Sequence, residues 1–454
     1  MPTSQFRRRA LRGWARWRAV LGHIPPPRLL LLGYLGYTVV GWILLCLPAA
    51  QEVHVGALDA LFVAASAVST TGLVTVDPGT SFTFFGELVV LLLIQAGGLG
   101  YMTIGSFVTL HIAARFFDRV RREATRSLFG LPEGVDPAGF VRGVVLFALG
   151  VEAAGAAALY VIFSDLGVED PAWSAIFHSV SAFATAGFSL NPDSFESFAP
   201  HVGLNLVISA LCIAGAMGFL IVIDLWRTLT GRARYLGFTS KVIWRITTAF
   251  LLAGTAILFV AEPSIQPMPA DERLMAAFFQ TMTASTTVGF NTVPIGGLAP
   301  AVLIVLMFLM IVGASPAGTG GGLKTTSFAA LVGLVRSTLK GRDRVRYDKR
   351  EIPPQRLQQA TAGLAWYMAL LFAATFLLLL ADPGLPFDAV IFEAISAMGT
   401  VGISMGITGE LTDLGKLIVI VLMTAGRVGI LTFGIALATH DESRDEEADN
   451  DLVL

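Results

Sequence analysis

A short pattern that occurs four times limits the fold of this chain more than any other feature. The four copies align without gaps on their last glycine and share Phe-x3-[Ser/Thr]-Ala-x2-Thr-x-Gly. They span 62–72, 177–187, 279–289 and 392–402, so their last glycines are 115, 102 and 113 residues apart. Composition alone rarely produces four matched copies at such spacing, and the sequence therefore predicts four tandem structural repeats.

Long apolar segments flank every copy. Of the 454 residues, 54% are hydrophobic and 14% are charged, whereas a soluble domain carries about 25% charged residues. An apolar helix of about 20 residues crosses a bilayer with its backbone groups satisfied internally. The candidate spans are 29–47, 88–112, 143–163, 202–223, 246–261, 302–311 with its continuation, 364–380 and 417–437. The chain is therefore predicted to be an all-α polytopic membrane protein with eight spans.

The apolar segment between the spans of each repeat is too short to cross. In the first repeat it covers 57–69, and 13 residues fit a re-entrant helix better than a span. Each repeat is thus predicted to be a helix, a short pore helix with a loop, and a second helix, arranged around a pseudo-fourfold pore. The predicted units are a basic segment 1–28, repeats 29–126, 127–240, 241–350 and 351–440, and an acidic tail 441–454.

The distribution of cations predicts the orientation. Of 31 Lys and Arg residues, 26 cluster before the first helix of a repeat, and the re-entrant sides hold only Arg273 and Lys416. The positive-inside rule then places both termini in the cytoplasm and the re-entrant loops outside. The net charge of −2 argues against nucleic acid as a partner.

Other classes of site receive little support. Cys46 and Cys212 lie in apolar segments without metal-binding spacing, so neither a zinc site nor a disulfide framework is expected. The six histidines are scattered and form no HExxH motif. A membrane enzyme remains only a remote alternative.

Four re-entrant loops around one axis can supply backbone carbonyls that replace the water around a bare monovalent cation such as K⁺. Glycine permits the backbone conformation that turns neighbouring carbonyls inward. The alternative is that the glycines only make turns and the Ser/Thr-Ala pairs only pack helices; the fourfold repetition favours the filter. The predicted selectivity-filter residues, which would also hold K⁺, are Thr70, Thr71, Gly72, Thr185, Ala186, Gly187, Thr287, Val288, Gly289, Thr400, Val401 and Gly402.

A glycine-rich segment interrupts the last helix of the third repeat. Proline and consecutive glycines disfavour a regular helix, and irregular backbone at membrane depth is tolerated only inside protein or a water-filled cavity. The segment is therefore predicted to lie in the pore, with a merely kinked helix as the alternative. It does not match a phosphate loop, because Leu323 separates its last glycine from Lys324. The predicted loop residues are Gly313, Ser315, Pro316, Gly318, Thr319, Gly320, Gly321, Gly322 and Lys324.

Arg427 lies within the last predicted span. A charge at membrane depth is costly and normally faces a cavity or a partner. Beneath a cation filter it would raise the barrier to permeation; alternatively, helix carbonyls or Glu152 hold it purely for packing.

Other polar residues also have two interpretations. His178, Gln280 and Glu393 each lie nine positions before a filter glycine. They could form hydrogen bonds behind the filter or could only pack there. Glu152 could carry protons or could simply be buried in its neutral form.

The quadruple Thr-x-Gly loops, the glycine-rich interruption and the arginine of the last helix resemble the Trk/Ktr/HKT superfamily of K⁺ transporters. The 28 residues before Leu29 are too few for the two additional N-terminal helices of Trk-type relatives, so the chain resembles the Ktr branch. This resemblance implies K⁺ uptake across a bacterial inner membrane, one pore per chain, a homodimer, and a KtrA-type cytosolic nucleotide-binding ring as partner. It also implies that the glycine-rich segment is a flexible gate. Gly72 implies selectivity for K⁺ over Na⁺, because plant relatives that transport Na⁺ have serine there.

The energy source stays open. Uptake is expected to be driven by the membrane potential, with Na⁺ activation left open, and no organic cofactor is expected in this chain. The alternative within transport is Trk-like symport of K⁺ with H⁺ or Na⁺.

Overall fold

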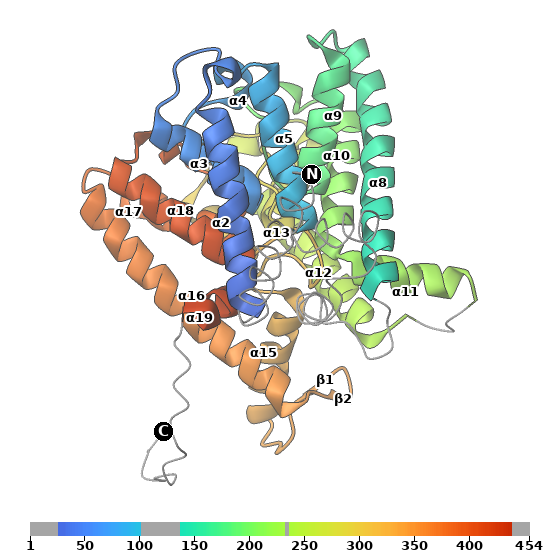
Figure 1. Ribbon diagram of the computed structural model, residues 1–454. Coiled ribbons are helices and arrows are strands. Elements are labelled where there is room, and N and C mark those ends of the chain that lie inside the picture. Colours follow the sequence, from blue (N-terminus) through green and yellow to red (C-terminus); the bar gives the residue numbers. More distant parts are fainter. Residues whose placement is uncertain (1–25, 101–136, 232–235, 438–454) are drawn as a thin grey trace, which may run out of the picture.

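The computed structural model describes residues 26–100, 137–231 and 236–437, which are mostly helical (Figure 1). The one sheet among these residues is an antiparallel hairpin of β1 (Arg346–Tyr347) and β2 (Arg350–Glu351). The predicted basic segment up to residue 25, the end of the second predicted span at 101–112 and the acidic tail lie outside the described residues.

Four long helices open the four repeats. They are α2 (Pro26–Leu45), α8 (Pro137–Asp165), α12 (Phe238–Ala261) and α16 (Pro354–Ala381). Each is long and apolar enough to cross a membrane. Their outer faces expose large apolar side chains such as Leu252 (68% exposed) and Phe372 (66% exposed), as expected of a surface that contacts lipid rather than water.

A short helix follows in each repeat. These helices are α3 (Ala57–Ser69), α9 (Pro171–Phe183), α13 (Ala270–Thr286) and α17 (Phe387–Gly399), and α3 begins and ends at the residues predicted for the re-entrant segment. The phenylalanine that starts the repeated pattern is fully buried in all four: Phe62, Phe177, Phe279 and Phe392. The pattern therefore marks the packed interior, where each ring anchors a short helix.

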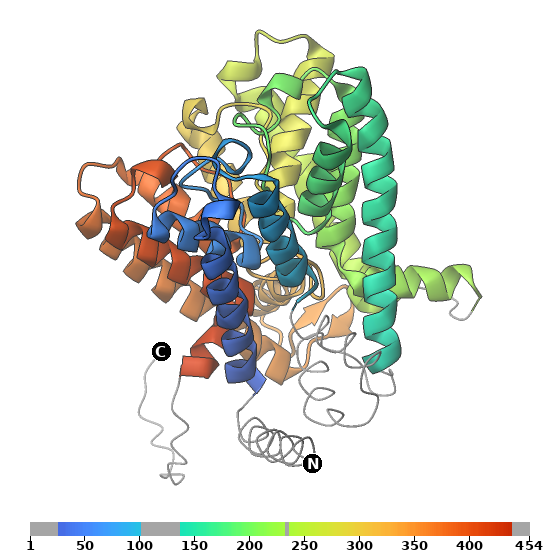
Figure 2. The ribbon, with the colours of Figure 1, turned by 45° about the horizontal axis from the view of Figure 1, so that its top comes forward.

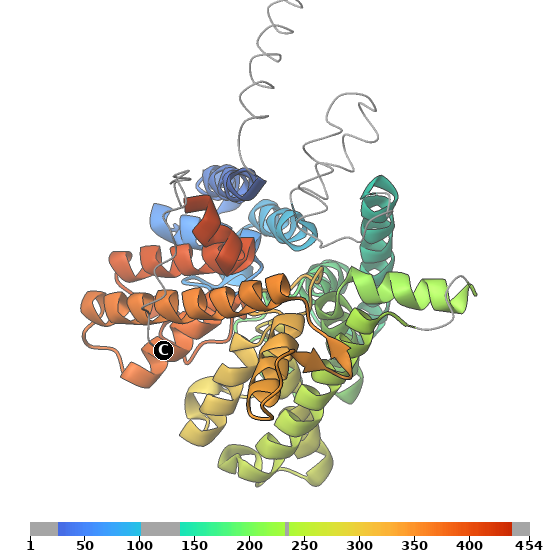
Figure 3. The same cartoon turned by 90° about the horizontal axis from the view of Figure 1, so that it is seen from below.

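A second helix completes each repeat and contacts the next one. These helices are α5 (Phe84–Leu99), α10 (Val202–Met217), α14 (Pro300–Ile311) and α18 (Asp413–Val428). Besides its own repeat, α5 packs on α9, α10 on α13, α14 on α17, and α18 on α3. The contacts thus run from each repeat to the next and from the fourth back to the first. Seen from below, the chain colours accordingly pass around a common centre (Figure 3).

Two of the eight predicted spans are bent pairs of helices and not single straight helices. The predicted span 202–223 is bent by 91° between α10 and α11 (Phe219–Leu229), and 417–437 is bent by 106° between α18 and α19 (Ile430–Leu437). Gly218 and Gly429 have positive φ at these bends, a conformation that ends an α-helix. Among the described residues, four helices are long enough to span, or six if each bent pair counts as one. Figure 2 shows α11 projecting sideways beyond α8.

The third repeat departs from helix over a longer stretch. α14 ends at Ile311 and α15 (Thr325–Thr338) begins after the glycine-rich loop. The remaining helical turns are short: α4 (Pro78–Ser81), η1 (Pro48–Ala50), η2 (Glu196–Phe198), η3 (Pro263–Ile265), η4 (Ile295–Gly297) and η5 (Thr408–Glu410).

Candidate selectivity filter and pore loop

A left-handed threonine ends the short helix, or follows it closely, in all four repeats. The φ angles are 51° at Thr70, 52° at Thr185, 55° at Thr287 and 49° at Thr400. Positive φ is disfavoured for a β-branched residue, and such strain persists only where the surrounding structure imposes it. Its fourfold occurrence shows that the repeated sequence pattern encodes one repeated backbone turn.

The glycine two residues later has no room for a side chain. All four also have positive φ: Gly72 (93°), Gly187 (67°), Gly289 (103°) and Gly402 (89°). A Cβ added to Gly72 would lie 2.5 Å from the carbonyl oxygen of Ala186, in the next repeat. Only glycine therefore allows the backbones of neighbouring repeats to approach this closely.

The same approach recurs around a closed ring. Gly187 lies against the carbonyl of Val288, Gly289 against that of Val401, and Gly402 against that of Thr71, while Gly72 contacts Ala186. Each repeat thus contributes one glycine and the carbonyl that precedes it. The structure brings all twelve predicted filter residues into four equivalent segments around one centre. Such a ring of carbonyl groups can replace the hydration shell of a cation.

Hydroxyl groups of the short helices hold the filter backbone in place. The amide of Gly72 donates to Ser66 Oγ at 3.1 Å, that of Gly289 to Thr283 Oγ1 at 3.0 Å, and that of Gly402 to Ser396 Oγ at 3.1 Å. In the second repeat, Ser181 Oγ instead donates to the carbonyl of Phe188 at 2.8 Å. Sequence reasoning weighed these Ser/Thr positions only as helix-packing residues. Their invariance within the pattern was the signal that could have revealed this function.

The polar residues nine positions before the filter glycines bond to the segment that follows the filter. His178 Nε2 contacts Ser189 Oγ at 3.1 Å, and Glu393 accepts a hydrogen bond from Ser404 Oγ at 2.7 Å. In the amide orientation that satisfies both of its polar atoms, Gln280 accepts from the amide of Thr292 at 2.8 Å. Of the two interpretations of these three residues, hydrogen bonding to the segment next to the filter is therefore confirmed over packing alone. In the first repeat the equivalent position is apolar.

Three of the four threonine hydroxyls lack a hydrogen-bond partner within the described part of the chain. The Oγ1 atoms of Thr70, Thr287 and Thr400 are buried and form no hydrogen bond with the described residues. Thr185 Oγ1 contacts Thr319 Oγ1 at 3.0 Å. Buried hydroxyls in a folded protein are normally bonded, so the three free ones fit a site for a cation or water at the end of the ring.

The glycine-rich loop lies against these threonines. A Cβ added to Gly320 would clash with Thr287 Oγ1, and one added to Gly321 with Thr400 Oγ1. Thr319 contacts Thr185, so the loop also touches the filter threonine of the second repeat. The loop residues predicted from the sequence thus lie at the threonine end of the filter, and the segment is not a kinked helix.

Hydrogen bonds attach the loop to the break in the second repeat. The amides of Ser315 and Thr319 donate to the carbonyls of Ala216 (3.1 Å) and Gly215 (3.2 Å), and the amide of Phe219 donates to Ala317 (3.0 Å). These bonds use backbone groups that the bend at Gly218 releases from the helix.

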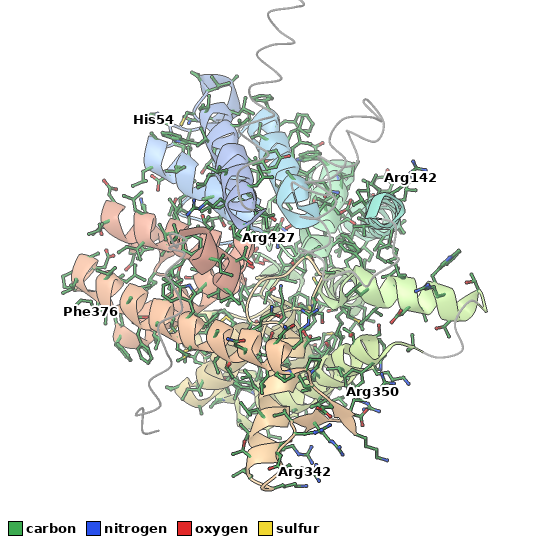
Figure 4. All side chains as sticks on the ribbon, turned by 60° about the horizontal axis from the view of Figure 1, so that its bottom comes forward. His54, Arg142, Arg342, Arg350, Phe376 and Arg427 are labelled. Atoms are coloured by element: carbon green, nitrogen blue, oxygen red, sulfur yellow. The ribbon has the colours of Figure 1, made fainter. Side chains whose placement is uncertain are left out.

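Two cations bind neighbouring carbonyls of the loop. Arg427 donates to the carbonyl of Thr319 and, from the other nitrogen of its guanidinium, to those of Gly97 and Gly98. Lys324 Nζ donates to the carbonyl of Gly320 at 2.6 Å. Arg427 lies near the centre of the molecule in Figure 4, between the first, third and last repeats. It therefore connects the loop to the end of α5.

Glu152 is not the partner of Arg427. The amide of Gln95 donates to both of its carboxylate oxygens, at 3.1 and 2.9 Å. Of the two packing alternatives, the structure therefore shows carbonyl binding and not the ion pair. Among the described residues, no group of three or more His, Cys, Asp or Glu side chains could hold a metal ion.

Comparison with known proteins gives a consistent result. The family model of TrkH, a cation transport protein, matches residues 37–446. Ktr system potassium uptake protein B of Bacillus subtilis is 33% identical over 434 residues, which cover 94% of this chain and 96% of that protein. Potassium/sodium uptake protein NtpJ of Enterococcus hirae is 32% identical over 434 residues, 92% of this chain and 94% of that protein.

The fold also matches a solved structure. The crystal structure of the potassium transporter TrkH from Vibrio parahaemolyticus superposes with a TM-score of 0.72 over 90% of this chain and 83% of that one. At 20% identity this likeness concerns the fold alone.

Proposed function

The chain belongs to the TrkH family of cation transport proteins, and we propose that it takes up K⁺ across a membrane through the central ring of filter segments. The observation that carries this proposal is the closed ring in which each filter glycine contacts the carbonyl of the next repeat. Relatives at 32–33% identity over more than nine-tenths of the chain are named as potassium or potassium/sodium uptake proteins.

The ring supports a preference for K⁺. All four repeats place glycine at the closest backbone approach, so four equivalent sets of carbonyls can surround one dehydrated ion. The threonine hydroxyls would add ligands at the end of the ring that faces the loop. Ion entry would be favoured by the C-terminal ends of the short helices, which carry partial negative charge.

The loop and its two cations would form the gate. They lie at the threonine end of the filter, where a positive charge opposes a cation that leaves it. Movement of the loop away from the three threonines would open the path. Arg427 would then act both as an electrostatic barrier and as a tether that keeps the loop in place.

Orientation and assembly follow from charge and from the family. The cation-rich ends of the long helices would face the cytoplasm of a bacterial cell, which places the filter mouth outside. A homodimer bound to a KtrA-type nucleotide-binding ring would regulate the loop. The membrane potential, worth about 2.3 kcal/mol per charge per 100 mV, suffices to drive uptake.

Ion flux across liposome membranes tests the proposal. The purified protein is reconstituted alone, and a voltage-sensitive dye follows the response to outward gradients of K⁺, Rb⁺ or Na⁺. We expect saturable responses to K⁺ and Rb⁺ and none to Na⁺. A response to K⁺ only when Na⁺ or a pH gradient is added would favour coupled symport or Na⁺ activation, the possibility that the name of NtpJ keeps open.

A further inference from the structure

A cationic cavity lies on the cation-rich face, away from the filter. The end of α15, the β1–β2 hairpin and the loop between them line an open cavity of about 840 Å³. Two carboxylates, Asp343 and Asp348, lie among its lining residues. Its six cationic lining residues are Arg336, Lys340, Arg342, Arg344, Arg346 and Lys349. Figure 4 shows Arg342 and Arg350 at the edge of the molecule on this face.

Within the described residues, carboxylates neutralise only part of the positive charge of the cavity. Asp348 is already paired with Arg245 of α12, and Arg344 pairs with Glu351 at 3.2 Å. No ion pair involves Lys340 or Arg342 in the part of the chain that the structure describes. An excess of unpaired cations around a cavity favours an anionic ligand.

Contacts to α12 place the cavity at the membrane surface. Arg350, in β2, lies over the ring of Phe238, the first residue of α12, at 4.9 Å from its centroid. The partner of Asp348 is Arg245, and Trp244 next to it is 58% exposed. Exposed indoles at the end of a spanning helix are typical of the headgroup region. Because Trp244 lies within the first two turns of α12, these contacts favour a cavity that opens near the depth of lipid headgroups.

The end of α15 presents apolar and cationic groups side by side. Val335 (55% exposed) and Leu339 (82% exposed) are one turn apart, and each is followed directly by a cation of the cavity, Arg336 or Lys340. Side chains four apart share a helix face. An apolar strip beside a cationic strip fits a phospholipid, which joins a phosphate to acyl chains, better than a soluble anion or an acidic protein surface.

We propose that this cavity binds the headgroup of an anionic phospholipid. Lys340, Arg342 and Arg346 hold the phosphate, and the acyl chains lie against Val335 and Leu339. Because α15 leads directly from the pore loop, the bound lipid stabilises the helix to which the loop is attached. Basic cavities at the cytoplasmic ends of spanning helices bind such headgroups in other membrane proteins.

Lipid binding by the full-length protein tests this site. Native mass spectrometry counts the lipids retained after addition of phosphatidylglycerol or phosphatidylcholine, and thermal unfolding reports the stabilisation by each. The variant Lys340→Gln/Arg342→Gln is compared with Arg142→Gln/Arg227→Gln, which removes two exposed cations elsewhere on the same face. We expect the first pair to lower retention of phosphatidylglycerol by about fivefold, equivalent to about 1 kcal/mol, and the second to leave it unchanged.

A second variant separates lipid from free phosphate. Val335→Thr/Leu339→Ser should weaken phosphatidylglycerol binding while both cations remain. Equal loss of binding in the two cation variants would overturn the proposal, as would stabilisation of the wild type by inorganic phosphate alone to the same extent. Normal lipid binding by Lys340→Gln/Arg342→Gln would also contradict it and, if that variant no longer bound the cytosolic partner, would assign the cavity to a protein contact.

Discussion

At the scale of single residues, the proposed filter depends on backbone positions that tolerate no ordinary side chain. The left-handed threonine and the glycine after it recur in four places with nearly the same angles. The glycine amide is bonded by a hydroxyl from its own short helix in three of the repeats. Each repeat therefore stabilises its own turn, and each glycine determines how closely the next repeat can approach.

Gly402→Ala should abolish most K⁺ flux. The new methyl group would clash with the carbonyl of Thr71 and would sit at φ 89°, which disfavours any side chain. We expect at least about a tenfold loss, corresponding to about 1.4 kcal/mol, in the liposome assay. Gly363→Ala is the control, because Gly363 has no atom near the added methyl group. Equal fluxes in the two variants would show that the ring does not carry the ion.

Ser396→Ala should reduce selectivity. It leaves the partly buried amide of Gly402 without its acceptor, a loss that costs about 1 kcal/mol or more. We expect the ratio of Rb⁺ to Na⁺ flux to fall several-fold. Ser396→Thr should preserve it, because the third repeat uses Thr283 in the same way. If the threonine variant is as unselective as the alanine variant, the hydroxyl does not support the filter.

At the scale of elements, the second helix is interrupted in the second, third and fourth repeats. Apolar composition predicted continuous spans through Gly218 and Gly429. A hydropathy pattern carries no information on backbone dihedral angles, so it could not reveal the positive φ at these glycines. The glycine-rich interruption of the third repeat was predictable, since proline and consecutive glycines disfavour helix directly. Its contacts with Thr185, Thr287 and Thr400 could not be predicted, because they depend on how distant repeats pack.

Arg427→Ala should increase K⁺ flux. The substitution removes a positive charge and the hydrogen bonds that join the loop to Gly97 and Gly98. We expect a rise of several-fold in liposomes. Unchanged or reduced flux in a well-folded variant would remove the barrier role.

Lys324→Gln should also increase K⁺ flux. The effect of the double variant Lys324→Gln/Arg427→Ala should be smaller than the sum of the two single effects on the free-energy scale. The two cations bind the carbonyls of adjacent loop residues, Gly320 and Thr319, so either substitution loosens the same segment. Comparison of the two single variants with the double variant gives the coupling free energy. Strict additivity would mean that the two side chains act on different steps.

At the scale of the whole molecule, four repeats close into one ring, because the fourth repeat packs on the first. The contact of α18 with α3 joins the last repeat to the first, and Lys416 and Asp59 form an ion pair of 2.7 Å across this junction. Both side chains are largely buried, at 13% and 23% exposed.

Breaking this ion pair should destabilise ring closure. Asp59→Asn should lower the free energy of unfolding by about 1 kcal/mol or somewhat more, because the pair is less exposed than a surface pair. Glu351→Gln, which breaks a pair with side chains 70% and 46% exposed, should have almost no effect. Thermal unfolding in detergent compares the two, and equal effects would show that the junction contributes no special stability.

Much of this architecture was predictable from the repeated pattern and the distribution of apolar residues. The pattern located the filter turns because every copy must meet the same backbone requirement. It did not reveal which neighbour each glycine meets, since that depends on the order of the repeats around the ring. The sequence predicted from its depth that Arg427 faces a cavity or a partner inside the protein, but it did not reveal the carbonyl partners on α5 and the loop.

Rb⁺ bound to the protein tests the central claim most directly. Anomalous diffraction from crystals grown in Rb⁺ locates the ion without assuming any transport mechanism. The account predicts a peak on the axis of the ring, among the carbonyls of Thr71, Ala186, Val288 and Val401. Ordered density for these four segments with no Rb⁺ between them, in a protein that transports Rb⁺, would contradict it.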